Sequence, residues 1–177
     1  MEVLECIETR RSVRKYTDRA VEKALVEKLV RAAQNAPTWK NSQTTRFTAV
    51  LDSEKRWQVR AALPDFNQNS TQNAPVYLIV SAVTRRSGYE RDGSATTPLG
   101  EGYTFFDCGA TVEALCLAAH DAGLATLIMG IFDGGKLRSA LKIPETEVPV
   151  VVLALGYPAD VPQMPKRRAL EEVLRVF

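Results

Sequence analysis

The chain has 177 residues, of which 45% are hydrophobic and 25% are charged, the balance of a soluble globular domain. That length suits one domain with a sizeable core. The formal net charge of +2 is too small to predict nucleic-acid binding by itself. No apolar run reaches the ~18 residues of a membrane span. We therefore expect a single domain over residues 1–177, with neither nucleic acid nor membrane as partner.

The cysteines predict free, buried thiols in a reducing compartment. Their number is odd, and no C-x-x-C occurs. Cys108 and Cys116 share a predicted helix, where a rise of 1.5 Å per residue separates them by about 12 Å, too far for a disulfide. The N-terminus lacks the basic start of a signal peptide. Together these features predict a cytoplasmic protein.

The predicted elements mix helices and strands without a strict alternation, which favours an α+β fold. Apolar residues at helical spacing predict helices at 2–9, 21–36, 54–63, 105–123 and 136–141. Short runs rich in β-branched residues predict strands at 46–51, 75–82 and 148–155, and 124–132 is a further apolar run.

The segments between these elements are expected to be irregular. Residues 38–43 form a polar loop after Pro37, and 67–73 form a loop rich in amides. Residues 84–102 contain four glycines and three arginines, so we expect a mobile excursion that could act as a lid. Residues 159–177 form a C-terminal arm that ends in an amphipathic piece.

One short stretch, Arg10 to Tyr16, concentrates positive charge. It contains Arg10, Arg11, Arg14 and Lys15 and no carboxylate. Guanidinium groups this close repel one another unless an anion lies between them, and their planar forks match phosphate oxygens. A basic run alone is more often a solvated turn, so the rest of the chain must decide.

No set of side chains predicts catalysis by the protein alone. His120 is the single histidine, and it is expected on a helix surface or at an interface. No His or Cys cluster has metal-ligand spacing, so no metal site is predicted. Neither G-x-S-x-G nor G-x-G-x-x-G is present, and Gly134-Gly135-Lys136 lacks the rest of a P-loop. An enzyme of this composition needs an organic cofactor.

Several motifs in the same order resemble the nitroreductase family of flavin enzymes. Each motif is short, but together they cover almost the whole chain. The motifs are R-R-S-V-R-K-Y at 10–16, A-P-T-W-K-N-S-Q at 36–43, N-A-P at 73–75, M-G-I-F-D at 129–133, and L-G-Y-P at 155–158 followed by Arg167 and L-E-E-V at 170–173.

The resemblance implies an FMN-dependent oxidoreductase with tightly bound FMN and NADH or NADPH as reductant. It implies an α+β fold with a central, mostly antiparallel sheet flanked by helices. It also implies an intertwined homodimer with FMN at the interface. Ping-pong hydride transfer through flavin N5 to a nitroaromatic, a quinone or a similar small-molecule acceptor would follow, with no catalytic side chain.

The same resemblance implies roles for individual residues. Arg10 and Ser12, with Arg11 near them, match contacts to the phosphate and ribityl chain. Arg14 matches a cation at the pyrimidine edge, where positive charge would stabilise the reduced ring. The remaining positions match amide contacts from the partner subunit (Asn41, Gln43), the loop beside N5 and O4 (Met129, Gly130, Ile131) and late cations on the phosphate (Lys166, Arg167, Arg168).

Two other interpretations stay open at this point. The chain could be a non-catalytic flavin- or nucleotide-binding module on the same fold. It could also be an RNA-binding domain, although its cations are clustered rather than spread over a face. Trp39, Phe66, Tyr103 and Phe105 are candidates to stack on an acceptor, with ordinary packing as the alternative.

Overall fold

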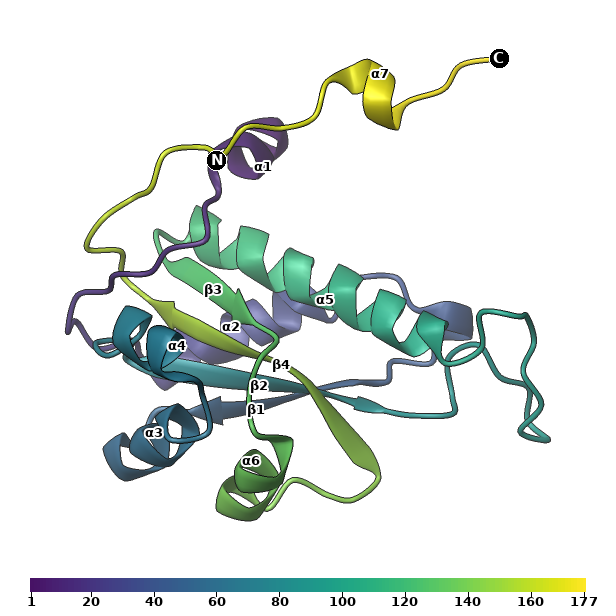
Figure 1. Ribbon diagram of the computed structural model, residues 1–177, viewed down its shortest axis with the longest axis horizontal. Helices are drawn as coiled ribbons and strands as arrows, with labels where there is room; N and C mark the ends of the chain where they lie inside the picture. Colours follow the sequence, from purple (N-terminus) through teal and green to yellow (C-terminus); the bar gives the residue numbers. More distant parts are fainter.

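The computed structural model describes residues 1–177 as a four-stranded sheet with helices on both faces (Figure 1). The strand order is β1-β2-β4-β3, and every neighbouring pair is antiparallel. The predicted α+β fold with an antiparallel sheet is therefore confirmed. The strands are β1 Thr45–Val50, β2 Val76–Val83, β3 Ala125–Met129 and β4 Glu147–Gly156.

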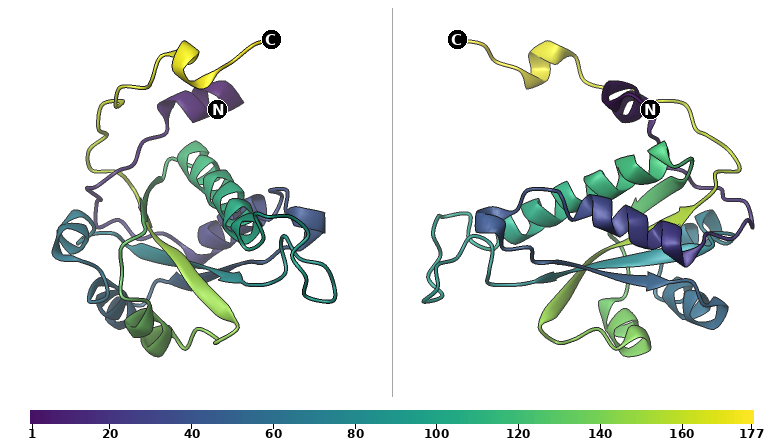
Figure 2. Two further views of the ribbon diagram at one scale, coloured as in Figure 1. Left: turned by 45° about the vertical axis from the view of Figure 1, so that its right-hand side comes forward. Right: turned by 180° about the vertical axis from the view of Figure 1, so that it is seen from behind.

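Helices cover both faces of the sheet (Figures 1 and 2). Helices α2 and α5 pack against one face, and α3, α4 and α6 lie on the other. No helix is both long and apolar enough to cross a bilayer. The helices are α1 Val3–Thr9, α2 Lys23–Ala33, the 3₁₀ turn η1 Trp39–Asn41, α3 Ser53–Arg60, α4 Asp65–Ser70, α5 Gly102–Asp121, α6 Gly134–Leu141 and α7 Leu170–Val173.

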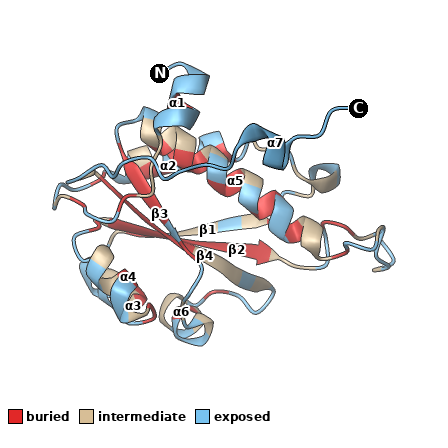
Figure 3. Cartoon of the chain, turned by 45° about the horizontal axis from the view of Figure 1, so that its top comes forward, coloured by how far each residue is buried: buried red, intermediate tan, exposed pale blue.

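Strand β2 divides the core into two halves. Leu78 and Val80 face α2 and α5, whereas Tyr77 and Ile79 face the opposite layer, as the two-residue period of a strand requires. All four side chains are fully buried, so the prediction of a doubly buried strand is confirmed (Figure 3). Burial of each large apolar side chain contributes about 1.5–3 kcal/mol.

Several predictions about the elements were wrong in their bounds or type. Helix α2 ends at Ala33 rather than at residue 36, and α3 ends at Arg60 rather than at residue 63. The amide-rich segment 67–73 is helical up to Ser70, because Pro64 starts α4 and the Ser70 hydroxyl donates to the Phe66 carbonyl. The long central helix begins at Gly102 rather than at residue 105. A Cβ at Gly102 would lie 2.8 Å from Cγ of Leu99, so glycine permits this close turn into α5.

The C-terminal arm, residues 159–177, leaves the end of the sheet and extends away from the body (Figure 1). Every residue in it is exposed, and α7 is its only regular element. Its apolar side chains, which include Leu170, Val173 and Phe177, have no cover within the chain. This amount of exposed apolar surface on one segment indicates a binding role.

Candidate functional site

The basic stretch runs in extended conformation along one end of the sheet. Its backbone is anchored where Val13 N donates to Thr126 O at 3.1 Å and Thr17 N donates to Tyr157 O at 2.9 Å. Val13 and Tyr16 are buried. Burial also raises the pKa of the Tyr16 phenol. Because these two residues hold the stretch, Arg14 between them is presented to solvent.

The three arginines of this stretch keep most of their positive charge unpaired. Nε of Arg10 lies 3.2 Å from Oε1 of Glu113, which is the only carboxylate paired with any of the three. Arg11 donates to the Glu8 and Arg10 carbonyls at 2.6 and 2.8 Å. Since carbonyls neutralise no charge, the group retains the character of an anion site.

A cavity of about 510 Å³ opens beside Arg14. Its other wall is formed by the end of α4 and the following turn, which supply Asn69, Gln72 and Asn73. The amide-rich segment thus faces the basic stretch, a contact that no sequence motif predicts. The usable signal was its density of amides, which carry both donors and acceptors.

The chain becomes exposed just after the end of β3. Met129 is buried in the core, whereas Ile131 is 65% exposed. A Cβ built on Gly130 meets no atom within 4 Å, so packing within the chain does not require glycine there. From Thr126, which bonds the basic stretch, to Gly130 the strand rises about 13 Å. The 129–131 loop therefore lies about 13 Å along β3 from the point where the basic stretch is anchored.

The structure does not bring Asn41 and Gln43 to this region. They precede β1, whose first residue pairs with Ala82 at the far end of β2. The basic stretch lies beside the opposite end, where Val76 pairs with Leu155. Eight residues of β2 span about 23 Å, so within one chain the two groups stand at opposite ends of the sheet (Figure 1).

The loop that holds Asn41 and Gln43 has an unusual backbone. Lys40, Asn41 and Gln43 have φ values of 44°, 55° and 48°, the left-handed region, which costs about 1–2 kcal/mol for each non-glycine residue. The Thr38 hydroxyl compensates in part by accepting a hydrogen bond from Gln43 N at 3.1 Å. Strain held in this way is frequent at ligand-binding loops.

The candidate aromatic residues divide between the two ends of the sheet. The Trp39 and Tyr103 rings lie 4.2 Å apart beside the excursion. Phe66 lies on α4 near the other end and is 58% exposed. The Trp39 indole N–H is buried without an acceptor, which is rare enough to indicate that a bound group or a second chain completes this region.

The excursion 84–102 projects beyond the end of β2 (Figure 2). Its base packs into the protein, because Ser87 is fully buried. Further out, Lys40 Nζ lies 2.9 Å from Oε1 of Glu90, and this hydrogen bond lowers the pKa of the Glu90 carboxyl. The excursion is therefore attached to the loop that carries Asn41.

The late cations lie in the exposed arm. Arg168 pairs with Glu172 at 3.2 Å, and neither Lys166 nor Arg167 forms an ion pair within the chain. The role of Lys166, Arg167 and Arg168 at a phosphate stays a prediction.

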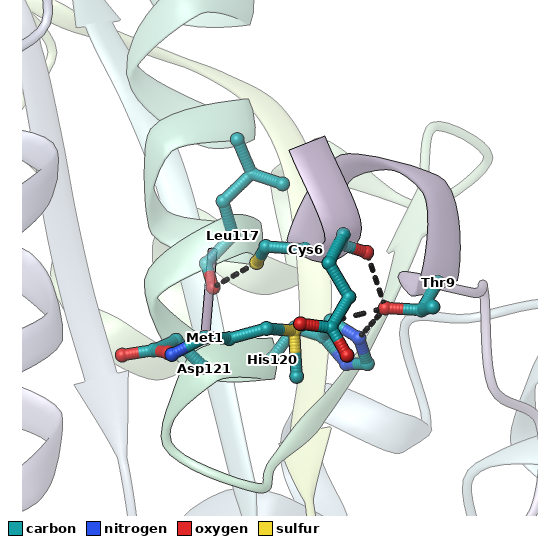
Figure 4. A network of polar contacts seen from close by, with 7 residues as sticks. Met1, Cys6, Thr9, Leu117, His120 and Asp121 are labelled. Atoms are coloured by element: carbon teal, nitrogen blue, oxygen red, sulfur yellow. Dashed lines mark hydrogen bonds and ion pairs between the residues drawn. The ribbon is translucent and has the colours of Figure 1, made fainter. Parts of the chain in front are cut away.

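Helix α1 is attached to the C-terminal half of α5 by polar contacts (Figure 4). The Met1 ammonium lies 2.8 Å from Oδ1 of Asp121, and the Thr9 hydroxyl lies 2.8 Å from Nε2 of His120. His120 is thus an interface residue, one of the two environments expected for it. Desolvation, assisted by Arg10 and Arg11, lowers its pKa.

The thiols are free and buried, as predicted. Burial raises the pKa of all three, that of Cys116 to about 11. A neutral buried thiol is a poor nucleophile. No cluster of His, Cys, Asp or Glu side chains is arranged to hold a metal ion.

Comparison with known proteins decides the family. The sequence model of the nitroreductase family matches residues 7–72 and 54–157. The chain belongs to the nitroreductase family. The resemblance drawn from the sequence motifs is thereby confirmed.

Individual members of the family agree with this assignment. A Methanothermobacter thermautotrophicus protein provisionally named NADH dehydrogenase/NAD(P)H nitroreductase is 32% identical, over 92% of this chain and 80% of its own. The Bacillus subtilis FMN reductase [NAD(P)H] is 26% identical, over 90% of this chain and 67% of its own length. A provisionally named nitroreductase from Desulfovibrio desulfuricans, solved with FMN, has a TM-score of 0.81 and 27% identity. The match covers 98% of this chain and 95% of that one.

Proposed function

We propose that this nitroreductase-family protein is an FMN-dependent oxidoreductase that works by a ping-pong mechanism. When bound, FMN supplies the hydride chemistry, between NADH or NADPH and a nitroaromatic, a quinone or a similar acceptor. Support comes from a relative named as an FMN reductase and from a solved neighbour in complex with FMN. No side chain of the chain itself has the environment of an activated nucleophile, which suits chemistry carried by a cofactor.

The observation that carries this proposal is the unpaired positive charge of the basic stretch, which lies beside the start of β3. Arg10 and Arg11, with Ser12, would hold the phosphate and ribityl end. Arg14 would face the ring edge from the amide-lined cavity, where a fixed cation favours the reduced ring. The Gly130 backbone, open on its Cα side, would let the ring approach at N5.

A second chain is part of the proposal because one chain does not bring all of the proposed contact residues together. The length of β2, about 23 Å, separates Asn41 and Gln43 from the basic stretch. Within one chain the two groups are therefore too far apart to contact the same ring. In a homodimer these amides would come from the partner subunit. Exposed apolar side chains on α1, α5 and the arm, including Leu4, Phe106 and Leu174, are the surface such a dimer would cover.

In the proposed dimer, a groove on the surface of the fold would receive the arm of the partner subunit. Strand β1 is an edge strand, and a cavity of about 800 Å³ lies along it between α2 and α6, lined by Val30, Phe47 and Leu141 among others. An open strand edge beside an apolar groove is suited to pair with an added segment. We expect the arm of the partner to fill it, which deletion of 160–177 would test by light scattering.

Stopped-flow mixing of purified protein with each nicotinamide, without oxygen, tests the function. The proposal expects bleaching of the flavin absorbance by NADH or NADPH alone, and its return when an acceptor is added in a second mix. In steady-state assays at several acceptor concentrations, double-reciprocal plots of rate against nicotinamide concentration should then give parallel lines. A flavin that binds but that neither nicotinamide reduces would instead favour the non-catalytic module.

A further inference from the structure

A buried polar cluster lies at the end of the sheet near Asn41. It joins three segments, which are the 38–43 loop, the base of the excursion and α5. Its centre is Asp107 in α5, which is 1% exposed. Oδ2 of Asp107 accepts hydrogen bonds from Ser87 Oγ at 2.5 Å and from the Trp39 backbone N–H at 3.0 Å. A buried carboxylate is destabilising unless it is well bonded, so these partners are held firmly in place.

The two partners come from different segments. Trp39 opens η1 in the 38–43 loop, and no side chain of that loop caps its first N–H; Asp107 satisfies it from another helix. Ser87 belongs to the base of the excursion. Ser42 closes the cluster, since its hydroxyl lies 2.6 Å from Ser87 Oγ and 3.4 Å from Asp107 Oδ2.

A second connection joins the same two segments at the surface. Lys40 Nζ contacts both carboxylate oxygens of Glu90, at 2.9 and 3.1 Å. An exposed ion pair contributes little stability alone. Here the ion pair adds to the buried cluster, which joins the same excursion to the same loop.

We infer that Asp107 and Ser87 latch the 84–102 excursion to the 38–43 loop, so that FMN binding and ordering of the excursion are coupled. The inference rests on the proposed function, because Asn41 and Gln43 of that loop are the proposed flavin contacts. Asp107 holds the start of this loop through the Trp39 N–H. Asp107 is a positioning residue, and the coupling is reciprocal: FMN bound to the loop also holds the excursion closed.

Limited digestion of the full chain with trypsin, with and without FMN, measures this coupling. The excursion offers cleavage sites at Arg85, Arg86 and Arg91, and mass spectrometry identifies the cut. Saturating FMN slows cleavage there at least about fivefold in the wild type. In Ser87→Ala, cleavage is fast with or without FMN, and the Kd for FMN rises at least about fivefold.

Ser81→Ala is the matched control. Ser81 is also a fully buried serine bonded to a carboxylate, that of Glu147. It lies in β2 close to the start of the excursion, but its side chain bonds neither Asp107 nor Ser87. It keeps the wild-type Kd and the wild-type protection by FMN. Asp107→Asn is the second variant: its remaining oxygen can accept from Trp39, so it retains part of the protection that Asp107→Ala loses.

The outcomes separate the latch from the proposed function. FMN binding without any slowing of cleavage in the wild type overturns the latch and leaves the proposed function standing. Full protection by FMN in both Ser87→Ala and Asp107→Asn overturns it as well. Wild-type protein that binds no FMN, seen in the absorbance spectrum before any digestion, overturns both.

Discussion

Nε of Arg10 lies 3.2 Å from Oε1 of Glu113, so α5 fixes the orientation of a guanidinium from the basic stretch. The side chains are 20% and 47% exposed, which makes the pair a partly solvated one. A bond through Nε leaves the two terminal nitrogens of the fork free for an anion. Glu113 therefore orients Arg10, the proposed phosphate contact, and leaves its two terminal nitrogens free.

Arg10→Ala is expected to weaken FMN binding by about 10- to 150-fold, because charge-assisted hydrogen bonds contribute about 1.5–3 kcal/mol. Glu113→Ala removes only the orienting contact, so it weakens binding by at most about fivefold. Glu113→Gln keeps an acceptor for Nε and stays close to the wild type. Titration by flavin fluorescence measures all three, and equal losses in Arg10→Ala and Glu113→Ala would refute this division of roles.

Arg14→Ala is expected to lower the flavin reduction potential as well as the affinity, since a cation at the ring edge favours the reduced form. A tenfold loss of that preference corresponds to about 30 mV for two electrons. Lys15→Ala is the neighbouring control, because Lys15 is exposed and pairs only with Asp160 at 3.8 Å. A still-yellow Arg14→Ala variant with an unchanged potential would remove Arg14 from the ring.

The stability of the α1–α5 contact is expected to fall in mild acid. The folded state depresses the pKa of His120 below its usual 6.5, so the unfolded chain binds a proton more readily. The free energy of unfolding therefore decreases as the pH drops below about 6.5 towards the lower folded value. Thermal melts at pH 7.5 and 5.5 should differ more for the wild type than for His120→Gln, which cannot titrate; the same difference in both would contradict this.

The three thiols are expected to resist modification in the native protein. Each cysteine is at most 6% exposed, and burial raises each pKa, so little thiolate forms at pH 8. Ellman's reagent should detect almost no thiol in the folded protein and three in guanidinium. Rapid native labelling of Cys108 or Cys116 would show that α5 opens readily.

Much of the fold could be predicted because the relevant signals are local. The apolar run of β2 and the helical spacing in α5 follow directly from burial on both faces. The prediction of a loop for the amide-rich segment was wrong, because Asn and Ser compete with the backbone and usually favour loops. Pro64 and packing against the core decide for helix there, and that information is not local.

The site was predictable only in part, for a related reason. Arg10 and Arg14 stand out by charge alone. The distance between the basic stretch and Asn41 depends on the length of β2 and on strand order, which no motif reveals. The Asp107 cluster joins residues 39, 87 and 107, whose separation along the chain hides their contact.

The most direct test of a site shared between two subunits uses hybrid dimers. Arg14→Ala chains and Asn41→Ala/Gln43→Ala chains, co-expressed with different affinity tags, give a heterodimer that carries both. If each site takes Arg14 from one subunit and Asn41 and Gln43 from its partner, one of the two sites is intact. The heterodimer should then bind about half an equivalent of FMN per subunit with wild-type affinity, at concentrations where both parent homodimers bind little. A heterodimer that binds FMN no better than its parents would contradict the shared site.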